Sequence, residues 1–287
     1  GPERGTPAAA SKEKEFVLED HLADILRERD ASGGPEAVPI RYRIRHTIRV
    51  KPGAVPRGET IRCWIPFPQE YRQQRDVKLI SASPEPKLIA PNAVEGNPVG
   101  GAPQRTIYME EQVTDPAKPI QFKEVFEYNS YAYYPQLDEA KVQPLPADWN
   151  GACLGERPPH IVFTDAMKQL SRRIVGDEQD PVRKAKLIFS WISSTIPWAS
   201  AREYSTIPNI SAYCLGSGHG DCGIRTLFFM TLCRLNGIPT KWQSGWMLHP
   251  VEVNLHDWCE MYVAGTGWVP VDQSFGVQPS SDEQVKY

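Results

Sequence analysis

Apolar and polar side chains alternate with a period of two through much of the segment from residue 38 to residue 135. From Ile40 to Arg45, apolar residues alternate with arginines. A similar strand-like pattern recurs at residues 61–65, 77–81, 106–112 and 120–131, which are separated by stretches rich in proline and glycine. Successive side chains of a strand point to opposite faces, so this pattern predicts short strands with one buried face. Several such strands joined by turn residues predict an antiparallel β-sandwich.

Helical spacing appears on both sides of this strand-rich segment. A helix is expected over residues 15–30, where one stripe carries the apolar residues Leu18, Leu22, Ile25 and Leu26. A second is expected over 165–175, and a third begins at Asp180 and Pro181, a capping residue followed by proline at the first helical position. Residues 222–236 are apolar on most sides, which predicts a buried central helix.

The remaining segments are interrupted by proline and glycine or read as strands. Four prolines between residues 144 and 159 predict a linker over residues 136–162. Three glycines at residues 216–220 predict that the segment 198–220 is a loop. Strand-like segments close the chain at residues 241–247, 256–263 and 267–271. The pattern as a whole predicts an α+β protein.

Composition excludes several function classes. The chain has 287 residues, a formal net charge of −3 and an apolar fraction of 40%. A dedicated nucleic-acid-binding protein usually has a basic excess, so no nucleic-acid partner is expected. No apolar run of about 18 residues is present, so no membrane span is expected. The oligomeric state stays open.

The N-terminus and the cysteines bear on the compartment. The chain begins at Gly1 and Pro2 without methionine, which favours removal of a targeting peptide and a secreted or periplasmic protein. Six cysteines are scattered without a paired Cys-x-x-Cys motif. This spacing favours neither a dense disulfide framework nor a zinc site, so we expect no metal or other cofactor, and a single disulfide remains open.

Cys222 is the strongest candidate for chemistry. A cysteine nucleophile works as the thiolate, and a helix N-terminus together with a nearby imidazolium stabilises that form. Cys222 lies where a glycine-rich loop enters the buried helix, and Gly220 and Gly223 allow close backbone approach around the sulfur. Backbone N–H groups at this turn are candidate donors to an oxyanion.

His256 and Asp272 are the candidate partners of this cysteine. His256 begins a strand, and the period of two places it on one face with Trp258 and Glu260. Asp257 therefore points away and is poorly placed to orient His256. Asp272 ends the next strand, and a short glycine-containing turn predicts a hairpin that brings this carboxylate beside the start of the His256 strand. There it can hold the imidazole tautomer.

Three separated blocks carry a resemblance to a known family. They are Gly220-Asp221-Cys222 before a helix that ends in Gly237-Ile238-Pro239, His256-x-Trp258-x-Glu260-x-Tyr262, and Gly267-Trp268-Val269-Pro270-Val271-Asp272. Their spacings, 256 − 222 = 34 and 272 − 256 = 16, resemble those of the transglutaminase-like superfamily. The resemblance covers residues 160–275 and implies a papain-like α+β core with nucleophile Cys222, general base His256 and orienting residue Asp272.

The resemblance also sets the expected domain organisation. The strand-rich region resembles the β-sandwich that often precedes this core. The segment from Trp64 to Pro68 is similar to a short motif seen in bacterial members of the superfamily. We expect a lead-in and helix over residues 1–37, the sandwich over 38–135, and the catalytic core with its linker over 136–287. Because 15 residues follow Asp272, the C-terminal β-barrels of the large animal enzymes are not expected, and no acidic cluster resembles a calcium site.

The rest of the site is less defined by sequence. Candidate substrate-cleft residues are His219, Trp198, Tyr213 and Trp258. The side chain that completes the oxyanion hole is open among Trp198, Tyr204 and Tyr213, and Glu260 is either a buried polar contact or a substrate contact.

Three functions fit these residues. The first is hydrolysis of an amide bond in a peptide or protein through a thioester, as in a cysteine peptidase or amidase. The second is transfer of the same acyl group to an amine, as in transglutaminase crosslinking. The third is a non-catalytic binding module on this fold.

Overall fold

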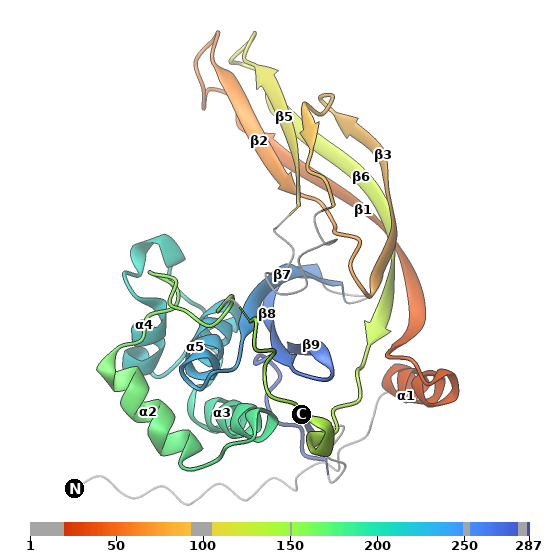
Figure 1. Ribbon diagram of the computed structural model, residues 1–287. Helices are drawn as coiled ribbons and strands as arrows, with labels where there is room; N and C mark the ends of the chain where they lie inside the picture. The colour runs from red at the N-terminus through yellow and green to blue at the C-terminus, as the bar shows by residue number, and fades with distance from the viewer. Residues whose placement is uncertain (1–19, 93–104, 150, 249–252, 281–285) are drawn as a thin grey trace, which may run out of the picture.

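The computed structural model describes residues 20–92, 105–149, 151–248, 253–280 and 286–287. Two three-stranded antiparallel sheets form an elongated upper part, and four helices with a third sheet form the lower part (Figure 1). Helix α1 (Asp20–Ser32) lies apart from the other helices and precedes β1. It confirms the expected helix within the described residues, since positions 15–19 lie outside them.

The upper part is a β-sandwich. One sheet has the order β1-β6-β3, with β1 (Glu36–Val50), β3 (Gln74–Ser83) and β6 (Ile120–Tyr133). The other has the order β2-β5-β4, with β2 (Thr60–Pro66), β4 (Leu88–Ile89) and β5 (Thr106–Gln112). The five predicted strands are confirmed, and the two-residue strand β4 is an addition that is too short to show a period.

The alternation in sequence becomes the inner faces of the two sheets. Ile65 and Ile107, opposite each other in β2 and β5, are fully buried against Phe122 and Phe126 of β6. Each large aromatic side chain buried in this way contributes on the order of 3 kcal/mol of hydrophobic free energy. The antiparallel sandwich predicted from the alternation is therefore present.

The lower part contains the helix expected over residues 165–175 and the helix predicted to begin at Asp180 and Pro181. Thr164 caps α2 (Asp165–Val175) by accepting from the Met167 N–H at 3.2 Å. Asp180 caps α3 (Pro181–Thr195) by accepting from the Arg183 N–H at 2.9 Å. Each cap satisfies a backbone donor that the helix leaves open, an effect worth about 1 kcal/mol. The predicted helix ends therefore follow from local hydrogen bonding.

The loop expected over residues 198–220 is wrong over part of its length. Residues Ile210–Ser217 form helix α4, and Tyr204–Thr206 form a short 3₁₀ turn. Asn209 caps α4 by accepting from the Ala212 N–H at 2.9 Å. Gly218 ends it in the left-handed conformation, with φ of 69°. The glycines that indicated a loop instead mark the end of a short helix.

Helix α5 (Cys222–Leu235) is the centre of the lower part. Most of its residues are buried, among them Phe228 and Phe229, as expected for a central helix. It packs against α2, α3 and α4 and against one face of the antiparallel sheet β7-β8-β9. The strands of this sheet are β7 (Thr240–Leu248), β8 (Val253–Val263) and β9 (Gly267–Val271).

The face of this sheet away from α5 meets the sandwich. Trp246 of β7 packs into the sandwich core and lies 6.0 Å from Phe126, ring centre to ring centre. The residues between β2 and β3 also reach this sheet, where Arg72 donates to the carbonyl of Trp268. The sandwich therefore lies directly over the strands that carry the predicted histidine.

Candidate active site

Cys222 begins helix α5, and the preceding loop holds it there through backbone contacts. The carboxylate of Asp221 caps the helix by accepting from the Ile224 N–H at 3.0 Å. The carbonyl of Gly220 accepts from the Ala199 N–H at 3.1 Å, which ties the loop to the segment after α3. A Cβ atom on Gly220 would lie 2.6 Å from the Ile224 side chain. Glycine is therefore required at this approach.

His256 and Asp272 form the hydrogen-bonded pair that the hairpin predicted. Nε2 of His256 lies 2.6 Å from Oδ2 of Asp272. The other carboxylate oxygen, Oδ1, accepts from the Ser274 N–H at 2.9 Å, which fixes the orientation of the group. The Trp258 ring stacks near the imidazole with ring centres 6.0 Å apart. The Asp272 hydrogen bond, with a contribution from Cys222, raises the pKa of His256 to about 10.

The environment of His256 favours an imidazolium at neutral pH. Its side chain is 13% exposed, and the carboxylate of Asp272 provides the nearby opposite charge. Because Nε2 is committed to Asp272, the interaction with Cys222 is left to the other ring nitrogen. This arrangement matches the thiol, imidazole and carboxylate order of a cysteine nucleophile with an oriented base. The structure thus brings together the three side chains proposed from sequence.

Asp257 is a neighbour of the thiol that the sequence reasoning missed. Its Oδ2 lies 3.8 Å from Sγ of Cys222, within reach of an S–H hydrogen bond. Asp257 does point away from the Asp272 side of His256, as predicted, but that direction leads to the first turn of α5. A Cβ atom on Gly223 would lie 2.9 Å from the same Oδ2. The strand period already indicated the direction of the Asp257 side chain. The sequence could not show that the first turn of α5 lies on that side of β8.

Two of the three oxyanion-hole candidates are committed to other contacts. The Tyr204 hydroxyl donates to Oδ1 of Asp221 at 2.5 Å, and burial followed by this bond raises its pKa. The Tyr213 ring meets the His219 ring edge-on, 6.4 Å away. Trp198 is 56% exposed and forms an isolated bridge with Gly220, directly before the nucleophile turn. Trp198 and Tyr204 both lie beside that turn, and of the two the Tyr204 hydroxyl is already bonded to Asp221.

The predicted substrate-cleft residues do not share one surface. A cleft of about 730 Å³ lies between the sandwich and strands β7 and β8, and Trp258 lines it with His256 and Asp257. Its sandwich side is aromatic and includes Tyr42, Phe67 and Tyr128. The other predicted residues, His219, Trp198 and Tyr213, are not among its lining residues. His219 instead places Nδ1 3.1 Å from the carbonyl of Ser217.

Glu260 is a buried polar contact, the first of the two roles left open by sequence, and it also lines the cleft. Its side chain is 3% exposed and forms ion pairs with Arg72 and with Nζ of Lys241, the latter at 2.8 Å. The Gln243 side-chain amide also donates to Glu260 at 2.8 Å. Arg72 comes from the sandwich and the other three from the third sheet, so this ionic cluster links the two parts of the chain.

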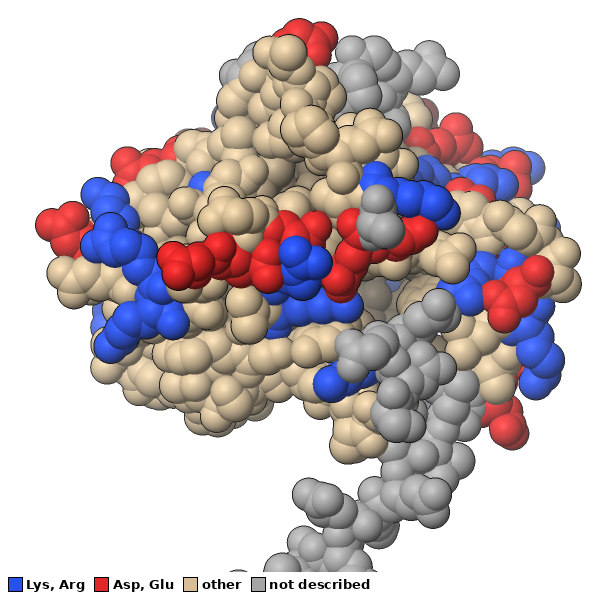
Figure 2. Space-filling view, turned by 60° about the horizontal axis from the view of Figure 1, so that its bottom comes forward, with Lys and Arg blue, Asp and Glu red and all other residues tan. Residues whose placement is uncertain are grey.

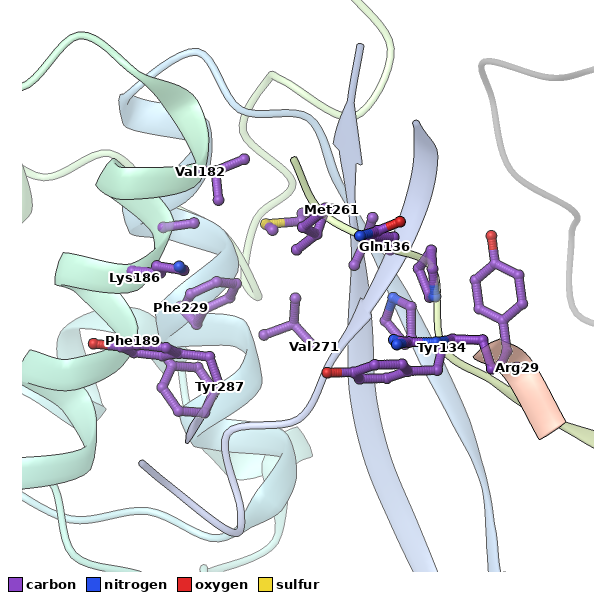
Figure 3. Close-up of a pocket in the computed structure, with 16 residues that line it drawn as sticks. Arg29, Tyr134, Gln136, Val182, Lys186, Phe189, Phe229, Met261, Val271 and Tyr287 are labelled. Carbon is purple, nitrogen blue, oxygen red and sulfur yellow. The ribbon is translucent and has the colours of Figure 1, made fainter. Parts of the chain in front are cut away.

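A second cavity, of about 270 Å³, lies on the opposite side of the third sheet (Figure 3). Its walls are mainly apolar, with Phe189 and Phe229 on the helix side and Met261 and Val271 on the sheet side. None of the predicted catalytic residues lines it. This cavity is therefore separate from the candidate site.

Within the described residues, neither a charged patch nor a cluster of metal ligands indicates a second functional site. The face seen in Figure 2 carries lysine, arginine and acidic side chains interspersed, without a broad patch of one sign. In the part of the chain that the structure describes, no cluster of three or more His, Cys, Asp or Glu could hold a metal ion. All six cysteines are free, and four of them are buried. No described helix is both long and apolar enough to cross a membrane.

Comparisons with known proteins find similar folds and a family model that matches part of the chain. The solved structure of a candidate cysteine protease from Cytophaga hutchinsonii has the same fold, with a TM-score of 0.61 and 16% identity, over 83% of this chain and 78% of that chain. The periplasmic domain of TgpA from Pseudomonas aeruginosa matches with a TM-score of 0.39 and 11% identity, over 82% of this chain and 70% of that chain.

A curated relative from Haemophilus influenzae, itself uncharacterised, is 28% identical over 151 residues. That match spans 40% of this chain and only 38% of the relative's length. Residues 168–273 match the model of the transglutaminase-like superfamily, a range that contains Cys222, His256 and Asp272. These residues therefore form a transglutaminase-like domain, as the sequence resemblance predicted.

Proposed function

We propose that this protein is a cysteine hydrolase that cleaves amide bonds in a peptide or protein substrate through a thioester. The observation that carries the proposal is the 2.6 Å pair of His256 and Asp272 beside a cysteine at the start of α5. A thiolate, an oriented imidazole and a helix N-terminus are together the components of a cysteine nucleophile. The fold neighbour described as a candidate cysteine protease agrees with this class.

The residues would act in two half-reactions. Sγ of Cys222, as the thiolate, attacks the amide carbonyl carbon while the imidazolium of His256 holds the proton that came from the thiol. His256 then gives that proton to the leaving nitrogen, and the amine departs, leaving a thioester on Cys222. In the second half, His256 takes a proton from water, the hydroxide attacks the thioester, and a carboxylic acid leaves as the thiol is restored. Asp272 remains ionised throughout and holds the imidazole in place.

Charge on the tetrahedral oxygen needs donors close to the sulfur. The N–H groups in the first turn of a helix have no acceptor inside the helix, so those of Cys222 and Gly223 are suitable by position. The indole N–H of Trp198, whose backbone bridges to Gly220, is a side-chain candidate beside this turn. Removal of one oxyanion donor typically costs about 10²–10³-fold in turnover.

The substrate would extend from the cleft beside His256 to Cys222, which does not itself line the cleft. A volume of about 730 Å³ lined by both aromatic and polar side chains suits a short peptide segment. Trp258 is the predicted cleft residue that lines this space next to the imidazole. The roles of His219 and Tyr213 in substrate binding stay predictions, as does a secreted or periplasmic location.

Selective alkylation tests the nucleophile. Cys222 and Cys153 are both partly exposed, whereas the other four cysteines are buried, so Cys153 is a matched control within the same molecule. Burial raises the pKa of Cys153, which slows its alkylation at neutral pH. With limiting iodoacetamide near pH 7, peptide mass spectrometry should find Cys222 modified much faster than Cys153, and more slowly after His256→Ala. Equal rates at the two thiols contradict the assignment.

Activity with an amine acceptor distinguishes the two enzyme classes. Glutamine-containing peptides are incubated with a labelled primary amine, while cleavage and ammonia release are followed beside amine incorporation. We expect cleavage or ammonia release without incorporation, and a loss of at least about 10⁴-fold in Cys222→Ala. Efficient incorporation instead identifies crosslinking, since the acyl-enzyme is the same. A selectively reactive Cys222 with no turnover of any amide substrate favours the binding module.

A further inference from the structure

Cys222 has two acceptors for its proton, and only one of them belongs to the proposed triad. His256 and Asp257 are adjacent in β8, so they leave the strand on opposite faces. At this point β8 runs past the end of α5, and both side chains reach the same sulfur. Oδ2 of Asp257 lies 3.8 Å from Sγ of Cys222, and the interaction with Cys222 also raises the pKa of His256.

The surroundings of the sulfur determine how these two acceptors differ. On the β8 side are His256, paired with Asp272, and Asp257. On the α5 side is Asp221, which accepts from the Ile224 N–H and from the Tyr204 hydroxyl. Burial, together with the charge of Asp221, raises the pKa of Asp257.

Arg225, the described cation on this helix near the site, donates to the carbonyl of Ser274 and interacts with the charge of Asp272, and no contact with the thiol is observed for it among the described residues. Two carboxylates therefore flank the thiol, while a single imidazolium opposes them. A negative charge at 3.8 Å disfavours the thiolate, whereas the imidazolium favours it.

We propose that Asp257 restrains the nucleophile by accepting a hydrogen bond from the Cys222 thiol, which keeps the proton on sulfur and opposes its transfer to His256. This inference rests on the proposed role of Cys222 as nucleophile and adds a residue that sets its reactivity. Asp257 also lines the cleft, so a substrate there removes water from its carboxylate and favours the uncharged acid, which takes its proton from solvent. The restraint is then released, and the proton of the thiol goes to His256.

The pH dependence of Cys222 alkylation tests the restraint without any substrate. A unit charge at this distance changes the ionisation of a neighbouring acid by about tenfold, so Asp257→Asn should lower the pH midpoint of alkylation by about one unit. A thiolate formed at lower pH is also about threefold less nucleophilic. The variant should therefore react about threefold faster than the natural protein below the midpoint and about threefold slower on the high-pH plateau.

The pH profiles of Cys222 alkylation in the variant and in the natural protein should cross, which separates this role of Asp257 from a structural one. The profile of Asp257→Ala should cross that of the natural protein in the same direction. Glu203→Gln, which removes one exposed negative charge near Tyr204, should shift the midpoint much less. Circular dichroism of each variant checks that the fold is retained. An unshifted midpoint in both Asp257 variants overturns the proposal, and so does slower alkylation at every pH, which would make Asp257 a support for the thiol.

Failure of the proposed function gives a different result. A protein without amidase activity whose Asp257 variants still show the crossing retains the restraint on a reactive thiol. A fully active protein whose profiles do not cross retains the hydrolase and loses only this inference.

Discussion

The ionic cluster around Glu260 predicts a large loss of stability when its carboxylate is neutralised. Glu260→Gln keeps the size of the side chain but removes the negative charge that pairs with Arg72 and Lys241. Side-chain exposure is 3% for Glu260, 9% for Lys241 and 17% for Arg72, so water cannot hydrate the two cations fully. The variant therefore leaves two buried like charges close together.

The magnitude follows from the distances and from the freedom of Lys241 to lose its proton. At an effective dielectric constant of about 20, a pair of unit charges 2.8 Å apart attracts by about 6 kcal/mol, much of which desolvation offsets. Breaking one partner of a buried pair typically costs about 3–5 kcal/mol. Burial and the Arg72 charge already lower the pKa of Lys241, so deprotonation limits the cost. We expect the lower end, about 3 kcal/mol.

The sign of the pH dependence follows from the same lysine. Its pKa in the folded state lies below its unfolded value, so the folded protein binds fewer protons and gains stability as the pH rises. Loss of Glu260 lowers the folded-state pKa further. The deficit of Glu260→Gln should therefore be larger at pH 6 than at pH 9.

Urea unfolding followed by tryptophan fluorescence measures this deficit. Lys241 lies 4.3 Å from the centre of the Trp268 ring, so one of the eight tryptophans contributes a signal from beside the cluster. Asp165→Asn, which removes the partner of the exposed Lys168, is the matched control and should cost well under 1 kcal/mol. Additional replacement of Arg72 and Lys241 by methionine should recover part of the loss. A deficit below 1 kcal/mol at pH 6, or one that grows toward pH 9, refutes the reasoning.

Two further substitutions test the site. Asp272→Asn should lower the pKa of His256 from about 10. A raised folded-state pKa stabilises the protein fully below about pH 6.5, and this stabilisation is lost as the pH passes 10. In urea titrations, the stability difference between the variant and the natural protein should therefore fall from about 1 kcal/mol at pH 6 to near zero above pH 10. An equal difference at both pH values would contradict it. Gly223→Ala places a Cβ atom 2.2 Å from the Tyr204 hydroxyl, so it should lower the free energy of unfolding by about 1–3 kcal/mol and slow alkylation of the Cys222 thiol. Gly216→Ala, where a Cβ atom would meet open space, is the control and should not destabilise the protein. Equal melting temperatures for the two variants would refute this.

Sequence predicted the parts of the site that depend on local register. A hairpin pairs residues by counting from its turn, so the approach of Asp272 to the start of the His256 strand could be predicted from spacing alone. Helix α5 could be predicted from its apolar content and from the residues at its ends. The alternation along β2, β5 and β6 likewise predicted which side chains face the sandwich core.

The parts that sequence could not predict depend on how separate elements pack. Nothing in the spacing places the first turn of α5 on the Asp257 side of β8, so the second acceptor of the thiol was missed. Arg72 lies in an irregular connection with φ of 44°, outside any periodic segment, and its contact with Glu260 joins positions far apart in the chain. Helix α4 was missed because its glycines end a short helix rather than form a loop.

The reach of Asp272 depends on where β9 stops pairing. Val271 is the last residue of β9 and pairs with Cys259, so Asp272 begins to leave the sheet just past that pair. From there its carboxylate bonds His256, three residues before Cys259. The turn that sets this register contains Gly265 and Gly267, whose φ angles of 95° and 101° suit glycine. A shift of one residue would turn the strand over and move the carboxylate to the α5 face, away from the imidazole. The proposed chemistry at Cys222 therefore depends on a turn at the other end of the β8–β9 hairpin as much as on the residues that touch the sulfur.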